Sequence, residues 1–222
     1  MAKLIFNNVG ERLFETGVKN GVLYVMGDDG AYENGVVWNG LTAVTESPSG
    51  AETTPLYADD VKYVVIYAAE EFGATVEAYT YPEEFEQCDG SAAISEGITI
   101  GQQTRKSFGM CYKTSVGNDV QGQDYGYKIH IIYGAKAAPS EKSYSTINDS
   151  PEAVTFSWEL STVPVPVEGH NPTATIVIDS TKVSKTLLEG LENMLYGTDT
   201  EDPYLPLPRE IMVLIALMEG TD

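Results

Sequence analysis

WNGLTAVTESPSGAETTPLYADD, residues 38–60, is the stretch that decides the fold of this chain. Its β-favouring run Leu41–Thr45 precedes the turn-rich segment Glu46–Gly50, after which the chain returns through Thr53–Tyr57. The next run, Val61–Tyr67, is β-branched and aromatic enough to form a further sheet strand. The pattern predicts a long hairpin with a polar tip, in which Leu41–Thr45 and Thr53–Tyr57 are the two arms.

The residues beyond this hairpin predict more β-sheet. Residues 74–81 alternate small apolar side chains with larger polar ones, as a half-buried strand does. Residues 104–114 and 125–133 predict two strands, which the glycine-rich loop 115–124 joins as a hairpin. Further strands are predicted at residues 21–27, 154–160 and 173–178.

Two helices are predicted. Pro82–Cys88 has proline at its first position, acids in the first turn and Gly90 just past its end. Residues 181–196 repeat apolar side chains at three- and four-residue spacing, with Asp179 or Ser180 as the candidate N-cap. The apolar positions of this second helix are Val183, Leu187, Leu188, Leu191, Met194 and Leu195.

Length and composition favour one β-rich domain with appendages. The chain has 222 residues and 42% apolar composition, enough to bury a core, and its 21 Gly and 14 Tyr are typical of β-proteins. We predict a mainly β fold, a β-sandwich or partly closed barrel of antiparallel strands with a flanking α-helix. The predicted parts are an N-terminal arm (1–20), a β-domain (21–197) with a hairpin loop (46–54) and a helix (181–196), and a C-terminal segment (198–222).

The C-terminal segment contains Glu210–Met218, which is nearly continuous in apolar residues. It is much shorter than the roughly 20 residues of a membrane-spanning helix, so it predicts a buried segment and no membrane anchor. Left exposed, it would form an apolar patch. Two alternatives remain open, packing on its own domain and docking on a neighbouring subunit. The residues that would make the inter-subunit contact are Ile211, Val213, Leu214 and Leu217.

The balance of acidic and basic residues limits the kinds of molecule that this protein can bind. With 33 acidic against 13 basic residues, the formal charge is −20, which repels phosphate and excludes attractive binding to nucleic acid. Two interpretations of the charge remain: a surface that keeps the protein soluble, or an acidic bore through which DNA passes without sticking.

Signatures of catalysis are missing from the sequence. His130 and His170 do not combine with Cys88 and Cys111 in a metal-binding spacing, and the two cysteines are expected to be reduced thiols. No nucleophile elbow, phosphate loop or dinucleotide fingerprint is present. We therefore predict a non-enzyme without catalytic, metal or cofactor residues. A carboxylate-pair glycoside hydrolase stays as a minor hypothesis, because acidic residues are abundant.

Several segments of this sequence are similar to segments in the proteins of a known family. They are NGLTAVTESPSGAE (39–52), LYADDVKY (56–63), FGATVEAYTYPEEFEQCDGS (72–91), and the segments 100–103, 108–112, 124–128, 140–142, 144–151 and 156–159. Across roughly Gly21–Gly197 the chain resembles the major tail proteins of long-tailed bacteriophages of the siphophage type, the subunits that stack into the tail tube.

The resemblance implies a structural virion protein that forms stacked, hexameric rings and a tube for DNA delivery. It implies self-association and contacts with other tail proteins: the tape measure, the tail terminator and the distal tail protein. It places the protein in the virion tail, and the start Met1–Asn8, which lacks a secretory signal, predicts assembly in the bacterial host cytoplasm.

The resemblance further implies that the loop around residues 46–54 stacks on the adjacent ring. The candidate stacking residues are Glu46, Ser47, Pro48, Ser49, Gly50, Ala51 and Glu52. The alternative function is a β-sandwich that binds carbohydrate or a host surface, since 14 Tyr and 2 Trp suit sugar platforms as well as subunit interfaces or internal packing.

Overall fold

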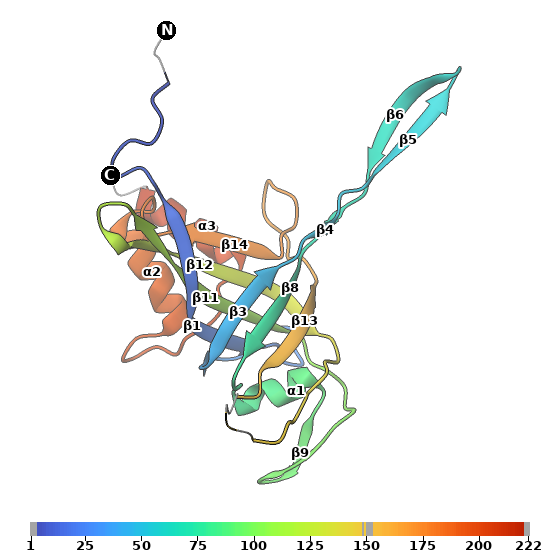
Figure 1. The fold of residues 1–222 in the computed structure, drawn as a ribbon, viewed down its shortest axis with the longest axis vertical. Helices are drawn as coiled ribbons and strands as arrows, with labels where there is room; N and C mark the ends of the chain where they lie inside the picture. The colour runs from blue at the N-terminus through green and yellow to red at the C-terminus, as the bar shows by residue number, and fades with distance from the viewer. Residues whose placement is uncertain (1–3, 148, 150–152, 220–222) are drawn as a thin grey trace.

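The computed structural model describes residues 4–147, 149 and 153–219. It is mainly β, as predicted, with a sheet body, the two long helices on one side of it, a short helix at one end and a thin two-stranded ribbon that projects away (Figure 1). The strands are β1 (Phe14–Val25), β2 (Val36–Trp38), β3 (Leu41–Glu46), β4 (Ser49–Gly50), β5 (Thr53–Ala58), β6 (Val61–Tyr67), β7 (Glu70–Glu71), β8 (Gly73–Ala78), β9 (Ala92–Ser95), β10 (Ile98–Ile100), β11 (Phe108–Asn118), β12 (Gly122–Ala137), β13 (Phe156–Thr162) and β14 (Thr175–Asp179). The helices are η1 (Glu83–Phe85), α1 (Glu86–Asp89), α2 (Lys185–Tyr196) and α3 (Pro208–Glu219).

The main sheet is antiparallel and has eight strands in the order β2-β1-β11-β12-β13-β8-β3, with β14 added on β12. The two residues Asn39 and Gly40 join β2 to β3, although these strands stand at opposite ends of that order. The sheet must therefore curl until β3 approaches β1. The result is the predicted sandwich-like arrangement, rolled around an inner core.

The curl depends on a bend in β12 at Gly134. Before the bend, Lys128–Ile132 pair with β14; after it, Ala135–Ala137 pair with β13. Gly134 has φ +58°, and a Cβ there would lie 2.3 Å from the carbonyl oxygen of Val163. Only glycine fits this position, because both the backbone angle and the space exclude a side chain.

The inner core is rich in aromatic rings. Trp158 lies with its ring centroid 5.0 Å from that of Phe85 and 5.7 Å from that of Trp38, in tilted or edge-on geometry. Phe85 comes from η1 and Cys88 from α1, which together close one end of the roll. The other buried members include Leu23, Val25, Val76, Phe108, Met110, Ile132 and Leu160.

A buried carboxylate holds this end of the roll together. Asp89 of α1 accepts a hydrogen bond from Trp158 Nε1 at 3.0 Å and another from Lys142 Nζ at 2.6 Å. Arg105 lies 3.6 Å from the same carboxylate. Burial would lower the pKa of Lys142, but the hydrogen bond and charge of Asp89 outweigh it and raise that pKa above its ordinary value.

The outer face of the sheet packs against the two long helices. Ile129, Ile131 and Tyr133 of β12 point to this side, because they alternate with the inward residues of the same strand. Leu191 and Leu195 of α2 are buried against them. The helix α3 packs on α2 so closely that a Cβ at Gly190 would lie 3.2 Å from Leu214, and Ile211 is buried in the same cluster.

The local sequence signals are largely confirmed. The short helix before Gly90 is present as η1 and α1, and Gly90 is left-handed with φ +78°. The alternation in β8 is confirmed too, because Ala74, Val76 and Ala78 are buried. Cys88 and Cys111 are free and buried, as expected.

The predicted cap of the second helix was wrong. The side chain of Ser184 caps α2 by accepting a hydrogen bond from the Leu187 N–H at 3.3 Å, so the helix begins at Lys185. Asp179 instead ends β14, where its carboxylate accepts hydrogen bonds from the Thr181 N–H and hydroxyl. These bonds make a turn and leave Asp179 unavailable as a helix cap.

Residues 1–3 and 220–222, which belong to the predicted terminal segments, lie outside the described residues, as do 148 and 150–152. Within the predicted N-terminal arm, residues from Phe14 onward already pair with β11. Within the C-terminal segment, Leu205 is buried and Tyr133 donates its hydroxyl to the Pro206 carbonyl at 2.8 Å. Much of both segments therefore contacts the body of the same chain.

Candidate functional site

The most unusual part of the molecule is the hairpin formed by residues 47–72. The predicted pairing of Leu41–Thr45 with Thr53–Tyr57 was wrong: β3 pairs with β8, and β5 pairs with β6. The tip is the two-residue turn Asp59-Asp60, with φ values of 51° and 61°. Aspartate tolerates this left-handed conformation, and such a turn matches the twist of a hairpin. The apparent turn 46–50 is the start of a ribbon that continues for another ten residues.

The ribbon leaves the sheet body and stands alone in solvent (Figure 1). From Ser49 to Asp59, at about 3.3 Å per residue, it reaches about 30 Å from its stem. The stem is the short ladder β4–β7, in which Ser49 is opposite Glu71 and Gly50 is opposite Glu70. Gly50 has φ +83°, and a Cβ there would lie 2.4 Å from the Ala69 carbonyl oxygen. This glycine allows the two strands to cross closely where the ribbon starts.

The two faces of the ribbon differ in chemistry because of a β-bulge. Leu56 is opposite Val64, but Tyr57 is opposite Lys62, so Tyr63 is the extra residue. The bulge shifts the alternation by one, and Val61, which is opposite Ala58, joins the same face as Val64. We call this the aliphatic face: Thr54, Leu56, Ala58, Val61, Val64 and Ile66. The opposite face carries Thr53, Pro55, Tyr57, Lys62, Val65 and Tyr67.

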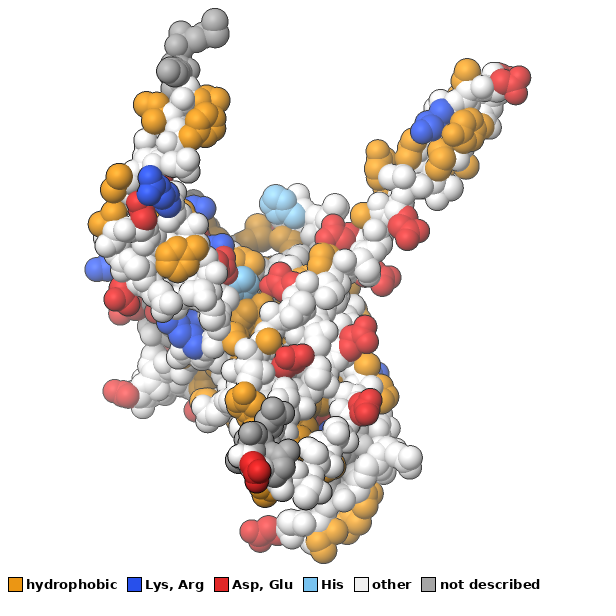
Figure 2. All heavy atoms as spheres, viewed as in Figure 1, with side chains coloured by type: hydrophobic (Ala, Val, Ile, Leu, Met, Phe, Trp, Pro, Cys, Tyr) orange, Lys and Arg blue, Asp and Glu red, His pale blue; other side chains and the backbone are white. Residues whose placement is uncertain are grey.

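The aliphatic face is exposed to solvent. Its largest side chains are exposed by 45% (Leu56), 60% (Val61) and 54% (Ile66). A two-stranded ribbon is marginally stable alone in water, and contiguous exposed apolar surface marks an interaction site. Figure 2 shows these apolar side chains gathered along the ribbon, with acidic side chains at its tip. The ribbon is therefore a candidate interaction surface.

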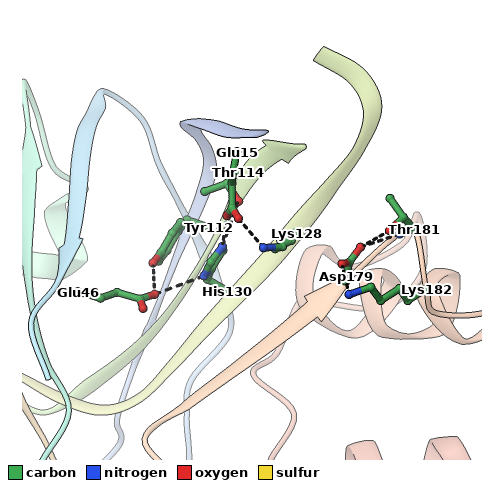
Figure 3. Close-up of polar contacts among 9 residues, drawn as sticks. All are labelled: Glu15, Glu46, Tyr112, Thr114, Lys128, His130, Asp179, Thr181 and Lys182. Atoms are coloured by element: carbon green, nitrogen blue, oxygen red, sulfur yellow. Dashed lines mark hydrogen bonds and ion pairs between the residues drawn. The ribbon is translucent and has the colours of Figure 1, made fainter. Parts of the chain in front are cut away.

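A polar network anchors the root of the ribbon at the open end of the rolled sheet (Figure 3). Glu46, the last residue of β3, accepts a hydrogen bond from the Tyr112 hydroxyl at 2.9 Å, and its carboxylate lies 3.3 Å from His130 Nδ1. The His130 ring stacks on Tyr112, with centroids 4.8 Å apart. On the other side of the imidazole, Nε2 lies 3.2 Å from the carboxylate of Glu15.

Glu15 joins this network to the first strand. Thr114 and Lys128 both donate hydrogen bonds to its carboxylate. Partial burial alone would raise the pKa of Glu15, but these donors outweigh it and hold the pKa below its ordinary value. Burial, together with the negative charge of Glu46, raises the pKa of Tyr112 well above its ordinary range. The network therefore fixes the exit of the ribbon relative to β1 and contains no group prepared for nucleophilic attack.

A second exposed apolar surface lies on α3. Its inner side chains pack on α2, but Val213 is 53% and Met212 is 37% exposed. Between α2 and α3 runs a groove of about 460 Å³, lined by Met194, Tyr204, Arg209, Glu210, Val213, Leu214 and Leu217. A helix that is apolar on both sides is typically covered on both sides.

A third exposed apolar surface is the N-terminal arm. Leu4, Ile5 and Phe6 are each about three-quarters exposed, at 77%, 74% and 77%. The arm is attached at Gly10, whose N–H donates to Asp119 Oδ1 at 2.9 Å. In Figure 2 the arm and the ribbon extend from different sides of the molecule.

The structure places the predicted site residues in two groups. Glu46 ends β3, Ser49 and Gly50 form β4, and Ala51 and Glu52 lead into the ribbon. They form the root and stem of the ribbon. The apolar residues of the ribbon beyond them were not predicted as site residues. The missed signal was two β-favouring runs of similar length on either side of Asp59-Asp60. The stacking role of residues 46–52 stays a prediction.

The C-terminal candidates divide between the two sides of α3. Ile211 is buried against the body of its own chain, and Leu214 packs there too but also lines the groove, as Val213 and Leu217 do. Packing of this segment on its own domain is therefore observed. An inter-subunit contact through these residues stays a prediction.

Metal and membrane features were searched in the described part of the chain. It contains no cluster of three or more His, Cys, Asp or Glu side chains arranged to hold a metal ion. No helix in the same residues has the length and hydropathy needed to cross a membrane. A cleft of about 270 Å³ beside the ribbon root is lined by Ser47, Glu71, Phe72 and Glu159, among others.

Comparisons with known proteins give weak structural similarities, as two solved structures illustrate. No family model matches the chain, and no curated protein matches it. One solved structure, the 6-fold symmetrised baseplate of the anti-feeding prophage, contains a chain with a TM-score of 0.38 and 8% identity, over 81% of this chain and 100% of that one. The sheath-tube complex of an extracellular contractile injection system in its extended state gives 0.31 and 15%, over 72% and 88%. Scores below 0.5 do not establish a shared fold.

Proposed function

We propose that this protein is a structural subunit of a phage-type tail, which assembles with copies of itself into stacked, hexameric rings of a tail tube. The observation that carries the proposal is the isolated ribbon β5–β6, whose aliphatic face packs on none of the residues that the structure describes. A subunit that always occurs in a polymer has a partner for such a face. The similarity of segments 39–52, 56–63 and 72–91 to siphophage major tail proteins supports the same role.

The charge suits a conduit. A formal charge of −20 repels DNA, so DNA can traverse the lumen of a tube built from this subunit without binding to its wall. In this role the protein is located in the virion tail after assembly in the host cytoplasm. Its further partners are the proteins that end and fill a tail: the terminator, the distal tail protein and the tape measure.

The proposal is tested by electron microscopy of the purified protein at rising concentration. We expect rings and tubes for the wild type. Replacing residues 52–68 by Asn-Gly joins Ala51 to Ala69 through a two-residue turn and removes the ribbon. We expect this variant to keep the circular dichroism spectrum of a folded β-protein and a near-normal Tm but to form no tubes, because the sheet body does not depend on the ribbon.

The matched control shortens the other exposed hairpin, β9–β10. Replacing residues 94–98 by Asn-Gly keeps the Ala93–Thr99 pair and removes a similarly exposed tip that contains Ile94 and Ile98. Tubes should still form in this control. If the wild type shows only dispersed particles at every concentration, the tube proposal is contradicted.

A carbohydrate- or host-surface-binding module is the second candidate, because three tyrosines on the ribbon, Tyr57, Tyr63 and Tyr67, are 68–75% exposed. The ribbon offers them no concave platform, so we rank this candidate lower. It predicts a monomer that binds glycans in an array, with binding lost when all three tyrosines become serine.

A further inference from the structure

We propose that the ribbon of one copy docks in the groove between α2 and α3 of the next copy, with the aliphatic face on the outer side of α3 and the tip aspartates beside Arg209. This inference rests on the proposed self-assembly and names the surface that receives the ribbon. It is carried by three properties of the two surfaces: chemistry, dimensions and position.

The chemistry of the two surfaces is complementary. The groove is lined by apolar side chains such as Met194 and Val213 and by two charged side chains, Arg209 and Glu210. The carboxylate of Glu210 already accepts a hydrogen bond from the Leu207 N–H at 2.8 Å, and the exposed Arg209 is the cation of the lining. The ribbon offers Leu56, Val61 and Val64 on one face and two carboxylates at its tip. Burying the aliphatic side chains removes apolar area from water, and a carboxylate beside guanidinium can form a two-pronged hydrogen bond.

The N-terminal arm is the competing occupant, and its charge disfavours it. Residues 1–13 contain Lys3 and Arg12 against Glu11, so the arm is net positive and brings Arg209 little to pair with. The ribbon tip, with Asp59 and Asp60 against Lys62, has the opposite sign. Of these two exposed apolar segments, the ribbon is the one with adjacent carboxylates at its end that can pair with Arg209.

The dimensions agree. Along α3, Arg209 and Leu217 are eight residues apart, or about 12 Å at 1.5 Å per residue. Along β6, Asp60 and Val64 are four residues apart, or about 13 Å at 3.3 Å per residue. With the tip at Arg209, Val64 therefore lies at the far end of the groove and Val61 lies near Val213.

The positions of the two surfaces make the contact repeat. The ribbon points away from the body, while α2 and α3 lie on the other side of the molecule, so a chain cannot fill its own groove (Figure 1). Docking between copies uses two different surfaces, which leaves one free ribbon and one free groove at the ends. Such a heterologous contact propagates, as a ring or a filament requires. A symmetric contact of α3 with α3 would instead close a dimer and leave both ribbons exposed.

Disulfide cross-linking between single-cysteine additions tests the inference. The full-length variants Val61→Cys and Val213→Cys are mixed at a concentration at which the wild type forms tubes, then oxidised and separated on a non-reducing gel. Native thiols do not interfere, because burial raises the pKa of Cys88 to about 12 and of Cys111 to about 11. The matched control replaces Val213→Cys by Val177→Cys, since Val177 on β14 is 50% exposed against 53% for Val213.

We expect at least about tenfold more heterodimer from Val61→Cys with Val213→Cys than from Val61→Cys with Val177→Cys, because docking raises the local concentration of one thiol near the other. The double variant with both cysteines should give a ladder of covalent oligomers. Equal cross-linking in both mixtures, or a dominant homodimer of Val213→Cys alone, would overturn the inference. If the wild type forms tubes but the specific cross-link is absent, only the docking surface is wrong; if it forms no tubes, the proposed function fails as well.

Discussion

The strand pairs β11–β12 and β5–β6 are both antiparallel, but they lie in different environments. β11–β12 carries packing on both faces, aromatic rings on the inside and α2 on the outside. β5–β6 has solvent on both faces, although its residues are more often β-branched than those of β11–β12. Pairing alone therefore does not explain the ribbon: its sequence has the apolar content of a buried strand, and in the proposed assembly the surface that buries it belongs to another copy.

The largest test of this comparison uses the same substitution in both pairs. Ile131→Ala, at a fully buried position of β12, should lower the free energy of unfolding by about 2–5 kcal/mol, through lost burial and a cavity. Ile66→Ala, at a 54% exposed position of β6, should change it by less than about 0.5 kcal/mol. Urea unfolding of the subunit below its assembly concentration measures both.

The order of the two effects should be reversed for assembly, where the substitution in the ribbon should have the larger effect. Ile66→Ala should raise the concentration at which tubes appear, because it removes part of the aliphatic face. A loss above about 1 kcal/mol from Ile66→Ala in the isolated subunit would mean that the ribbon packs on its own body, contrary to the comparison.

A second test acts on the joint between the two regions. Gly50→Ala places a Cβ 2.4 Å from the Ala69 carbonyl oxygen in a left-handed conformation, which should cost about 1–3 kcal/mol at the stem. Because the stem carries little of the core, we expect this cost as increased amide exchange in residues 49–71, with a near-normal Tm. Gly97→Ala is the control, since Gly97 also has positive φ but has nothing within 4 Å of its Cβ position. Equal exchange in the two variants would show that the close crossing is unimportant.

The smallest effect concerns the network at the ribbon root. Glu15 has a pKa below its ordinary value of 4.5, so its contribution to stability is complete above about pH 4.5 and is lost as the pH falls through the folded-state pKa. Glu15→Gln should therefore cost about 0.5–1 kcal/mol at pH 7, a modest figure because the side chain is 34% exposed, and progressively less as the pH falls below about 4.5. Glu70→Gln, on the exposed stem, is the control. Chemical unfolding across this pH range decides the matter, and a pH-independent difference would contradict it.

The parts of the fold that could be predicted are those set by nearby residues. Pro82 and Gly90 bracket the short helix, and the alternation of Ala74, Val76 and Ala78 identifies the inner face of β8. Both signals act within one turn or one strand. They hold whatever the rest of the chain does.

The ribbon could not be placed by the same reasoning. Glu46–Gly50 is rich in turn residues, yet they serve a stem where strands cross, and the true turn is Asp59-Asp60. Strand partners depend on the whole sheet. β3 is the end strand of the rolled sheet and pairs there with β8. For the same reason Asp179 closes a turn after β14, and Ser184 caps the helix. At the candidate site, the residues at the root of the ribbon could be predicted from the sequence. The aliphatic face could not, because it depends on a bulge that no local sequence pattern indicates.

That bulge makes the ribbon tolerant of a change in length, which its composition does not suggest. Tyr63 is the one residue of β6 without a partner in the register, so it adds length to β6 without adding a pair. Without Tyr63, Lys62 would follow Val64 in regular alternation, the pairs Tyr57–Lys62 and Ala58–Val61 would be kept, and Val61 would stay on the face of Val64. A related subunit that lacks this one codon would therefore present the same aliphatic face on a tip with less local bend and twist.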